Sequence, residues 1–406
     1  MATVVLVGTL DTKGREYAYL ADRIREHGAD VLLVDAGIVG EPLATPDVTR
    51  EEVAAAAGAD VHDLAAAGDR GVAVETMGRG AAEIVLRLRA EGRLDAIGGL
   101  GGSGGSSIAT HAMQQLPIGV PKLMVSTVAS GDTSPYVGSV DVTMMYSVVD
   151  IAGINRISAQ ILTNAAAALA AMAGATVPPL GEEKPLIAAS MFGVTTAGVT
   201  VARERLEELG YEVLVFHQTG AGGGSMEALI GAGFIAGSLD MTTTEFCDLV
   251  AGGVLVAVPE RLESAGKHGV PQVVSLGALD MVNFGPLDTV PDRYRERNLY
   301  VHNPTITLMR TTPDECREIG GIIGDKLNAA TGPTVLFMPL RGVSAIATEG
   351  QVFHDADADR ALFDTIRAIV DPAKVEVHEV EADVNDPTFA LAMANRLHEL
   401  ISERAS

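Results

Sequence analysis

Strand-like runs alternate with helix-like patterns along most of this chain, and the series occurs twice. A shift of 182 positions places Gly28 on Gly210. Gly119-Val120-Pro121 and Gly269-Val270-Pro271 each precede an apolar run in their own half. Because such alternation is typical of a parallel sheet covered by helices, the sequence predicts an α/β fold with two Rossmann-like subdomains, parallel sheets and a cleft between them.

The expected elements follow from the apolar patterns. Strands are predicted at 4–7, 31–34, 94–97 and 122–126 in the first half, and at 186–189, 213–216 and 272–276 in the second. Helices are predicted at 16–27, 80–91 and 199–209. A segment rich in proline and charge, 176–185, is the predicted linker. The expected domains are therefore 1–177 and 186–406.

Composition narrows the class of protein. A chain of 406 residues suits two domains, and a formal charge of −24 argues against a nucleic-acid partner. No signal peptide is apparent, and the alanine-rich stretch 157–177 contains Gln160, Thr163 and Asn164, which favours a buried helix over a membrane span. We expect a soluble, cytoplasmic protein without a membrane partner. Two cysteines, Cys247 and Cys316, have no metal-type spacing.

Ten residues from Gly98 to Ser107 contain six glycines and follow an apolar run. Glycine lets a ligand approach the main chain, and backbone N–H groups at the start of a following helix attract an anion. The segment therefore predicts a phosphate-binding loop formed by Gly101, Gly102, Ser103, Gly104, Gly105 and Ser106. The alternative is a glycine-rich turn needed only for helix–strand packing.

The end of the first predicted strand offers further polar groups. Gly8, Thr9, Asp11, Thr12 and Lys13 would line the same ligand site. Lys13 supplies a cation for phosphate, and Asp11 could hold magnesium directly or through water. Alternatively, Asp11 and Thr12 cap the following helix.

Three more segments could complete a nucleotide site. Asp35 lies where Rossmann-type folds place the acid that binds a ribose hydroxyl, although a turn role fits equally well. Met77 and Gly78 could line a base pocket, or Met77 could be an ordinary core residue. Ser130 and Gly131 could form the wall opposite the glycine run, or belong to an ordinary loop.

The second half carries a different polar set. Its members could form a substrate-binding or acid–base site, although each alone also suits a structural role; they are Asp240, Glu245, Asp280, Asn283, His302 and Arg310. No Ser-His-Asp, zinc or nucleophilic-cysteine pattern is present, and Cys247 is expected to be inert.

Several segments together resemble a known family. They are Gly8–Lys13, Gly99–Gly105, Ser126–Gly131, Val148–Asn155, Thr242–Glu245, Ala278–Gly285 and His302–Pro304. Nearly the whole chain is similar to the family that contains the ATP-binding domain of the tomato tobamovirus-resistance protein and many uncharacterised bacterial members. The resemblance implies that ATP binds near the glycine run, and it supplies no reaction.

Three functional hypotheses remain. The first is an ATP-dependent enzyme that uses magnesium for phosphoryl transfer to, or activation of, a small polar or carboxylated substrate. The second is a nucleotide sensor without turnover, and the third is an enzyme that acts on an anionic metabolite without ATP. The apolar stretch Met144–Met172 additionally predicts a homodimer or a larger homo-oligomer.

Overall fold

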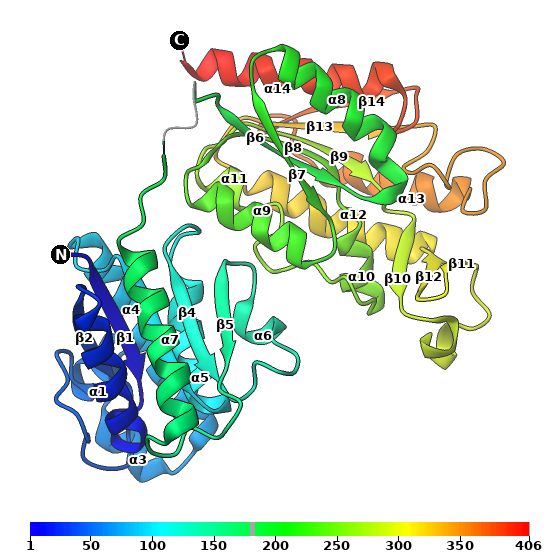
Figure 1. The fold of residues 1–406 in the computed structure, drawn as a ribbon. Coiled ribbons are helices and arrows are strands. Elements are labelled where there is room, and N and C mark those ends of the chain that lie inside the picture. Colours follow the sequence, from blue (N-terminus) through cyan, green and yellow to red (C-terminus); the bar gives the residue numbers. More distant parts are fainter. Residues whose placement is uncertain (179–182, 406) are drawn as a thin grey trace. The chain divides into compact units, whose positions relative to one another are not determined.

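The computed structural model describes residues 1–178 and 183–405. These belong to two compact units, Met1–Pro179 (unit 1) and Leu180–Ser406 (unit 2) (Figure 1). Residues 179–182 of the predicted linker lie outside the described residues. The predicted cleft between the halves concerns the placement of one unit relative to the other, and it stays a prediction.

Unit 1 is built on a parallel sheet of order β2-β1-β3-β4-β5. Its elements are β1 (Thr3–Gly8), α1 (Leu10–Glu26), β2 (Asp30–Asp35), α2 (Arg50–Ala56), α3 (Val61–Ala67), α4 (Arg70–Ala90), β3 (Ala96–Gly101), α5 (Ser103–Gln114), β4 (Lys122–Ser126), α6 (Ser134–Val137), β5 (Val142–Tyr146) and α7 (Arg156–Ala173). Alternate side chains of β1 point to opposite faces, so Val4 and Leu6 pack with α1 and α7, while Val5 and Val7 pack with α4 and α5. The carboxyl ends of all five strands share one edge of the sheet.

Unit 2 combines a parallel sheet of order β14-β13-β9-β8-β6-β7 with an antiparallel sheet of order β10-β12-β11. Its strands are β6 (Leu186–Met191), β7 (Glu212–His217), β8 (Ile235–Thr242), β9 (Gln272–Gly277), β10 (Met281–Phe284), β11 (Leu299–Asn303), β12 (Ile306–Arg310), β13 (Thr334–Pro339) and β14 (Val375–Val380). Its α-helices are α8 (Thr196–Glu208), α9 (Ala221–Gly231), α10 (Glu245–Ala251), α11 (Ser264–Lys267), α12 (Pro313–Asn328), α13 (Ala356–Ile369) and α14 (Pro387–Ala405). The antiparallel sheet was not among the elements that the sequence predicts.

The two parallel sheets confirm the predicted α/β class and its repeat. When β6, β7, β8, β9 and β13 are matched with β1 to β5, both sheets have the same strand order, and unit 2 adds β14 at one edge. Gly28 and Gly210 both take a positive φ, 85° and 96°, just after α1 and α8. These two equivalent glycines therefore let the chain leave a helix in the same backbone conformation in both halves.

The glycine run is less of a loop than the sequence predicts. Gly98–Gly101 belongs to β3 and Ser103 already starts α5, so only Gly102 lies between strand and helix. Two helices also begin earlier than expected, α1 at Leu10 and α4 at Arg70. Glycines obscure the helical pattern of α4, and Gly80 has a packing reason, because a Cβ there would lie 1.9 Å from the carbonyl oxygen of Val53.

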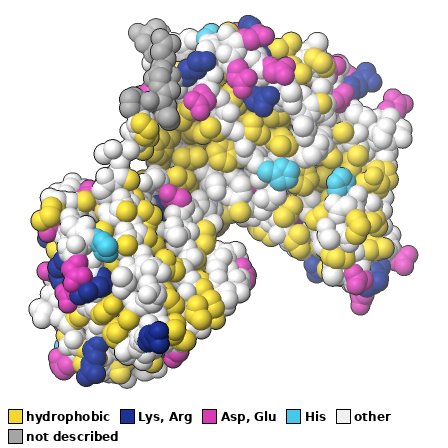
Figure 2. Space-filling view, in the orientation of Figure 1, with side chains coloured by type: hydrophobic (Ala, Val, Ile, Leu, Met, Phe, Trp, Pro, Cys, Tyr) yellow, Lys and Arg dark blue, Asp and Glu magenta, His cyan; other side chains and the backbone are white. Residues whose placement is uncertain are grey.

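The alanine-rich stretch forms α7, which covers one face of the unit 1 sheet. Leu162, Ala165, Ala166 and Leu169 are its main buried side chains. Apolar side chains also extend along its outer side (Figure 2). Among the described residues, no helix is long and apolar enough to cross a membrane.

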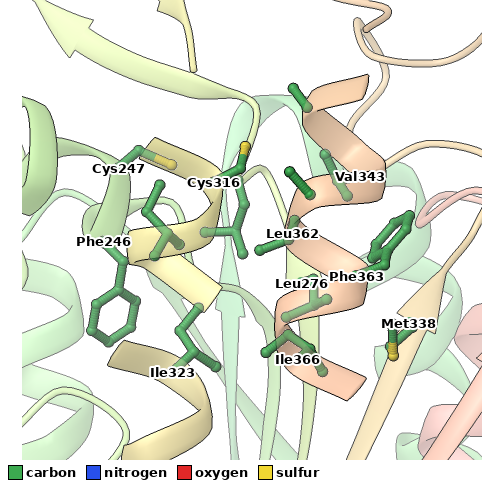
Figure 3. Close-up of a cluster of buried hydrophobic side chains, with 14 of the residues drawn as sticks. Phe246, Cys247, Leu276, Cys316, Ile323, Met338, Val343, Leu362, Phe363 and Ile366 are labelled. Carbon is green, nitrogen blue, oxygen red and sulfur yellow. The ribbon is translucent and has the colours of Figure 1, made fainter. Parts of the chain in front are cut away.

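Both cysteines lie in the core of unit 2. Cys247 on α10 and Cys316 on α12 are buried among side chains from β9, β13 and α13 (Figure 3). Burial raises the pKa of both thiols. A buried thiol with a raised pKa is a poor nucleophile, which agrees with the inert role expected for Cys247.

Candidate functional site

A cavity of about 640 Å³ lies at the carboxyl edge of the unit 1 sheet. Its lining comes from the starts of α1, α4 and α5, the end of α3, and the segments after β2 and β5; the residues are Thr9, Asp11, Thr12, Lys13, Ala36, Ile38, Val39, Ala65, Gly68, Asp69, Arg70, Ala73, Val74, Met77, Gly101, Gly102, Ser103, Gly104, Gly105, Ile108 and Asp150. In a sheet of this order, ligands bind at the switch point between the first and third strands. The volume falls within the range of roughly 300–1,000 Å³ typical of small-molecule sites.

Tyr17 helps to separate the two strands at this point. The pairing of β1 with β3 runs from Val4 to Leu6 on the β1 side and then stops. Beyond it, the Tyr17 hydroxyl accepts a hydrogen bond from Leu100 N at 2.8 Å and lies 2.7 Å from the carbonyl oxygen of Val7. A Cβ on Gly8 would lie 1.9 Å from that hydroxyl, so the glycine at this position is explained by packing against Tyr17.

Some glycines of the run are required by packing within the protein. A Cβ on Gly98 would lie 2.7 Å from Leu169 Cδ1. One on Gly99 would lie 2.7 Å from the Cβ of Ala109. These residues let α7 and α5 pack closely against β3, which is the alternative role considered from the sequence.

Three other glycines of the run have no such reason. Gly102 has a φ of −82°, while Gly104 and Gly105 lie in a regular helix. The nearest atom to a Cβ would be 3.6 Å away at Gly102 and 3.4 Å away at Gly105. At Gly104 it would be the flexible end of Arg70, at 3.2 Å. All three line the cavity, where glycine leaves the main chain open to close approach by a ligand. Gly102 is also the N-cap of α5, a position that favours glycine.

The electrostatics of this wall favour an anion. The N-cap of α5, Gly102, has no side-chain cap, and the first turn of α5 contains no acidic residue. Lys13 and Arg70 line the cavity, and neither has an acidic partner among the described residues. Helix N-termini and free cations both stabilise negative charge. Arg70 was missed from the sequence because the helix that it begins was expected to start at Gly80.

Another part of the lining is apolar. Ala36, Ile38 and Val39 follow β2, while Val74 and Met77 come from α4. Met77 is almost completely buried and belongs to the core on that face, which is the alternative considered from the sequence. It also lines the cavity, and its contact with a base stays a prediction. A flat apolar group would be accommodated here.

Asp35 does not line the cavity. Its buried carboxylate accepts hydrogen bonds from Leu10 N at 3.0 Å and Gly37 N at 2.9 Å, and it pairs with Arg50 at 2.8 Å. Because both oxygens are used inside the protein, this geometry does not fit the predicted ribose-binding role. It fits the turn role that was the alternative.

Asp11 lies against the segment after β2. Its Oδ2 accepts a hydrogen bond from Val39 N at 2.8 Å and a longer one from Gly40 N at 3.4 Å, while Oδ1 is buried without a partner. A Cβ on Gly37 would lie 2.5 Å from the carboxyl carbon. The carboxylate therefore fixes this segment. Neither Asp11 nor Thr12 is the N-cap of α1, because both lie inside its first turn and the N-cap is Thr9.

The remaining predicted nucleotide-site residues lie outside the cavity lining. Gly78 faces His111 on α5, and Ser106 is buried with its hydroxyl 2.7 Å from that of Ser126. Ser130 and Gly131 belong to the turn after β4. These four residues are close in sequence to lining residues or to a strand end, but none of them lines the cavity.

Charged side chains fill the corresponding position of unit 2, between β6 and β8. The completely buried Arg261 pairs with Asp240 at 2.5 Å, Glu245 at 2.9 Å and Glu227 at 3.4 Å. Burial raises the pKa of Glu227 and Glu245, against the opposing effect of Arg261. We call these four residues the Arg261 cluster. Because it is buried, Asp240 and Glu245 cannot contact a substrate in this conformation.

Asp280 and Arg310 form a second buried group. Asp280 Oδ2 accepts a hydrogen bond from Ser344 at 2.7 Å, and its Oδ1 has no partner. Arg310 pairs with Asp359 at 2.6 Å and donates to the carbonyl oxygen of Phe353 at 2.7 Å. Burial raises the pKa of Asp280 to about 6.

Asn283 and His302 belong to neither group. Asn283 is buried, and its side chain donates to Asp248 at 3.2 Å. His302 is exposed on β11, where Tyr300 is its nearest ring neighbour. The structure therefore does not assemble the six predicted residues of the second half into one acid–base site. Their spacing in sequence could not reveal which of them are buried.

A second glycine run, Gly220–Gly224, was missed from the sequence. It starts α9, and a Cβ on Gly222 would lie 1.8 Å from the carbonyl oxygen of His217. One on Gly223 would lie 2.0 Å from Glu245 Oε1. These two glycines have a packing reason, in contrast to Gly102, Gly104 and Gly105.

Metal ligands are not clustered in the part of the chain that the structure describes. No group of three or more His, Cys, Asp or Glu side chains there could hold a metal ion. A magnesium ion at the unit 1 cavity would therefore need phosphate or water oxygens in addition to one or two carboxylates.

Family models match both units. Residues 2–178 match the N-terminal domain, and residues 184–401 the C-terminal domain, of the uncharacterised protein family UPF0261. A UPF0261 protein of Clostridium tetani is 55% identical over 97% of this chain and 98% of its own length. One of Mesorhizobium japonicum is 46% identical over 97% of this chain and 98% of its own length.

A plant protein is also similar to nearly the whole chain. The ToMV susceptible protein tm-1(GCR26) of Solanum lycopersicum is 36% identical over 98% of this chain, which spans 55% of the plant protein. Among solved structures, Acinetobacter baumannii MurG matches over 99% of this chain and 93% of its own, with 12% identity and a TM-score of 0.22. A TM-score this low carries no argument about function.

Proposed function

We propose that this chain, which belongs to the uncharacterised protein family UPF0261, binds a nucleoside polyphosphate in the unit 1 cavity. ATP is the ligand that the resemblance seen in the sequence implies. The base would lie against the apolar wall after β2 and on α4, and the phosphates at Gly102–Gly105. Magnesium would accompany the phosphates.

One observation carries this proposal. Glycine at positions 102 and 105 is explained neither by a positive φ nor by a Cβ contact shorter than 3.4 Å, and at position 104 the closest contact would be the flexible end of Arg70, at 3.2 Å. A Cβ on Gly104 would lie against Arg70 and Val74, which also line the cavity, and would narrow the space that a phosphate at the α5 N-terminus needs. Free Lys13 and Arg70 would compensate the phosphate charge in a chain whose formal charge is −24.

Two outcomes of nucleotide binding are compatible with the cavity. In the first, the protein is an ATP-dependent enzyme acting on a small polar or carboxylated metabolite. In the second, it is a nucleotide sensor without turnover. The burial of Asp240, Glu245, Asp280 and Arg310 favours the sensor, because no assembled substrate site accompanies them.

Thermal unfolding tests nucleotide binding directly. A ligand that binds only the native state stabilises it by about 2.7 kcal/mol at 100 times its dissociation constant. We expect the Tm to rise with ATP, less with ADP and least with AMP, because each phosphate adds contacts to the α5 N-terminus. Lys13→Met should reduce the rise, and Arg15→Met, which changes an exposed cation of α1 outside the cavity lining, should not. No rise with any nucleoside phosphate at millimolar concentration would reject the proposal.

A further inference from the structure

Val148, just after β5, has an unusual backbone conformation. Its φ is 63°, and Val149 N donates to the carbonyl oxygen of Ser147 at 2.6 Å, which closes a γ-turn around Val148. A positive φ is strongly disfavoured for a β-branched residue. Such strain persists only when the surrounding structure imposes it.

The structure fixes the chain on both sides of this turn. Before it, the buried Ser147 donates its N–H to Ser126 O at 3.1 Å and its hydroxyl to Val149 O at 2.7 Å. After it, Ile151 is buried in the core, and Gly153 N donates to Glu16 on α1 at 2.5 Å. Asp150 therefore has a defined main-chain position next to α1.

Asp150 differs from the other acidic residues of the cavity lining because its carboxylate is not engaged by the protein. Of the three acidic residues in the lining, Asp11 holds the segment after β2, and Asp69 caps α4 by accepting hydrogen bonds from Gly71 N and Val72 N. The exposed carboxylate of Asp150 has no hydrogen bond or ion pair among the described residues. The contacts on both sides of the strained turn thus fix the main chain of a cavity residue whose carboxylate has no partner among the described residues.

A free carboxylate beside bound phosphates would repel them unless a cation lies between. The hydrogen bond from Gly153 N to Glu16 brings the segment of Asp150 beside α1, whose first turn contributes Thr12 and Lys13 to the same lining. Mg²⁺ is commonly held by one or two carboxylates together with substrate phosphates and water. Resting on the proposed function, we propose that Asp150 holds the divalent cation that accompanies the nucleotide phosphates.

Asp11, which the sequence favoured for this role, suits it less. Its Oδ2 already accepts two backbone hydrogen bonds, and its Oδ1 is enclosed next to Gly37. A magnesium ion retains several water ligands, which an enclosed oxygen leaves no room for. Asp11 is therefore a positioning residue for the segment after β2.

Calorimetric titration of the full chain with ATP, once in EDTA and once in excess MgCl₂, tests this assignment. Asp150→Asn should weaken the binding of MgATP roughly 10–100-fold, as loss of an oriented metal contact does. The same variant should bind metal-free ATP as well as the wild type or better, because a repelling charge is gone. Asp11→Asn should change the affinity for both forms by the same factor. Asp288→Asn, an exposed acid in unit 2, is the matched charge control and should alter neither.

Val148→Gly provides a second, independent variant. Glycine adopts a positive φ without strain, so the Tm should not fall. The factor by which magnesium increases the affinity for ATP should decrease, because the position of Asp150 is fixed less firmly. If the wild type binds both forms and Asp150→Asn leaves their ratio unchanged, the inference is wrong while nucleotide binding stands. If the wild type binds neither metal-free ATP nor MgATP, the proposed function itself is wrong.

Discussion

Tyr17 and Leu100 are joined by hydrogen bonds in both directions, from Leu100 N to the Tyr17 hydroxyl at 2.8 Å and from that hydroxyl to Leu100 O at 3.0 Å. The hydroxyl replaces the backbone pairing between β1 and β3 beyond Leu6. Burial raises the pKa of Tyr17, so the hydroxyl stays protonated and can donate. At the switch point of unit 1, the Tyr17 side chain thus takes the place of main-chain pairing between β1 and β3.

Tyr17→Phe should therefore destabilise unit 1. The change leaves Leu100 N without its acceptor and removes the one hydroxyl proton that Val7 O and Leu100 O share. A buried unsatisfied group costs about 1–3 kcal/mol. Chemical denaturation measures this loss. Tyr19→Phe is the control, since the partly buried Tyr19 hydroxyl contacts Thr163 and water can replace that bond. Equal losses for the two variants would show that Tyr17 has no special role at the switch point.

Arg261→Met should destabilise unit 2 more than any surface change. It leaves the carboxylates of Glu227, Asp240 and Glu245 buried without their cation, and breaking a buried pair typically costs about 3–5 kcal/mol. Because protonation neutralises buried acids, the loss should be larger at pH 8 than at pH 5.5. Arg295→Met removes an exposed pair with Asp292 and should cost less than about 1 kcal/mol. A pH-independent loss for Arg261→Met would contradict the account of the cluster.

Stability should also fall with rising pH in the wild type. Burial raises the pKa of Asp248 to about 7 and that of Asp280 to about 6. An acid with a raised folded-state pKa binds its proton more tightly in the native state than in the unfolded state. Its contribution to the free energy of unfolding is therefore complete below about pH 4 and is lost as the pH rises through 6–7. Acids with lowered pKa values, such as Glu263 and Glu376, stabilise the folded protein at neutral pH and lose this stabilisation only when the solution is acidified.

Unfolding free energies at pH 5.5 and pH 8 test this direction. Asp280→Asn cannot titrate at this position, so its unfolding free energy should decrease between these pH values by about 0.8 kcal/mol less than that of the wild type. The wild type at a third, intermediate pH serves as the internal control. An identical decrease in the variant would mean that Asp280 keeps an ordinary pKa in the folded protein.

Self-association is expected through unit 1. Tyr146, Ile154 and Ile157 are 43%, 42% and 48% exposed near the end of the edge strand β5 and the start of α7. Contiguous exposed apolar side chains commonly mark an interface. Light scattering at micromolar concentration should give at least twice the chain mass of 42.1 kDa, and Ile157→Lys should lower it. A wild-type mass near 42.1 kDa would contradict the prediction.

The sequence revealed the architecture better than the site. Strand Lys122–Ser126 was predicted with its observed bounds, and the repeat followed from glycines that end equivalent helices. Ion pairs between residues that are not neighbours in sequence, such as Asp35 with Arg50 and Asp240 with Arg261, could not be predicted. Local patterns show the periodicity of burial, whereas the direction of a polar side chain depends on tertiary packing.

The strained turn at Val148 illustrates the same limit. Valine favours extended backbone, so nothing in its sequence context indicates a positive φ. Asp150 was noticed only within a segment that resembles a family motif. Its freedom from partners becomes visible only when Asp11, Asp35 and Asp69 are seen to be engaged elsewhere.

Titration calorimetry of ATP with Gly104 variants tests the central claim most directly. A side chain at Gly104 would project toward Arg70 and Val74, and replacing a helical glycine stabilises a helix by itself. Gly104→Ala should therefore weaken ATP binding and Gly104→Val should abolish it, with no loss of Tm in either. Gly321→Val, at an open helical position of unit 2, should bind ATP like the wild type. If Gly104→Val binds ATP with wild-type affinity, the glycines at the start of α5 do not hold phosphate and the proposed site is wrong.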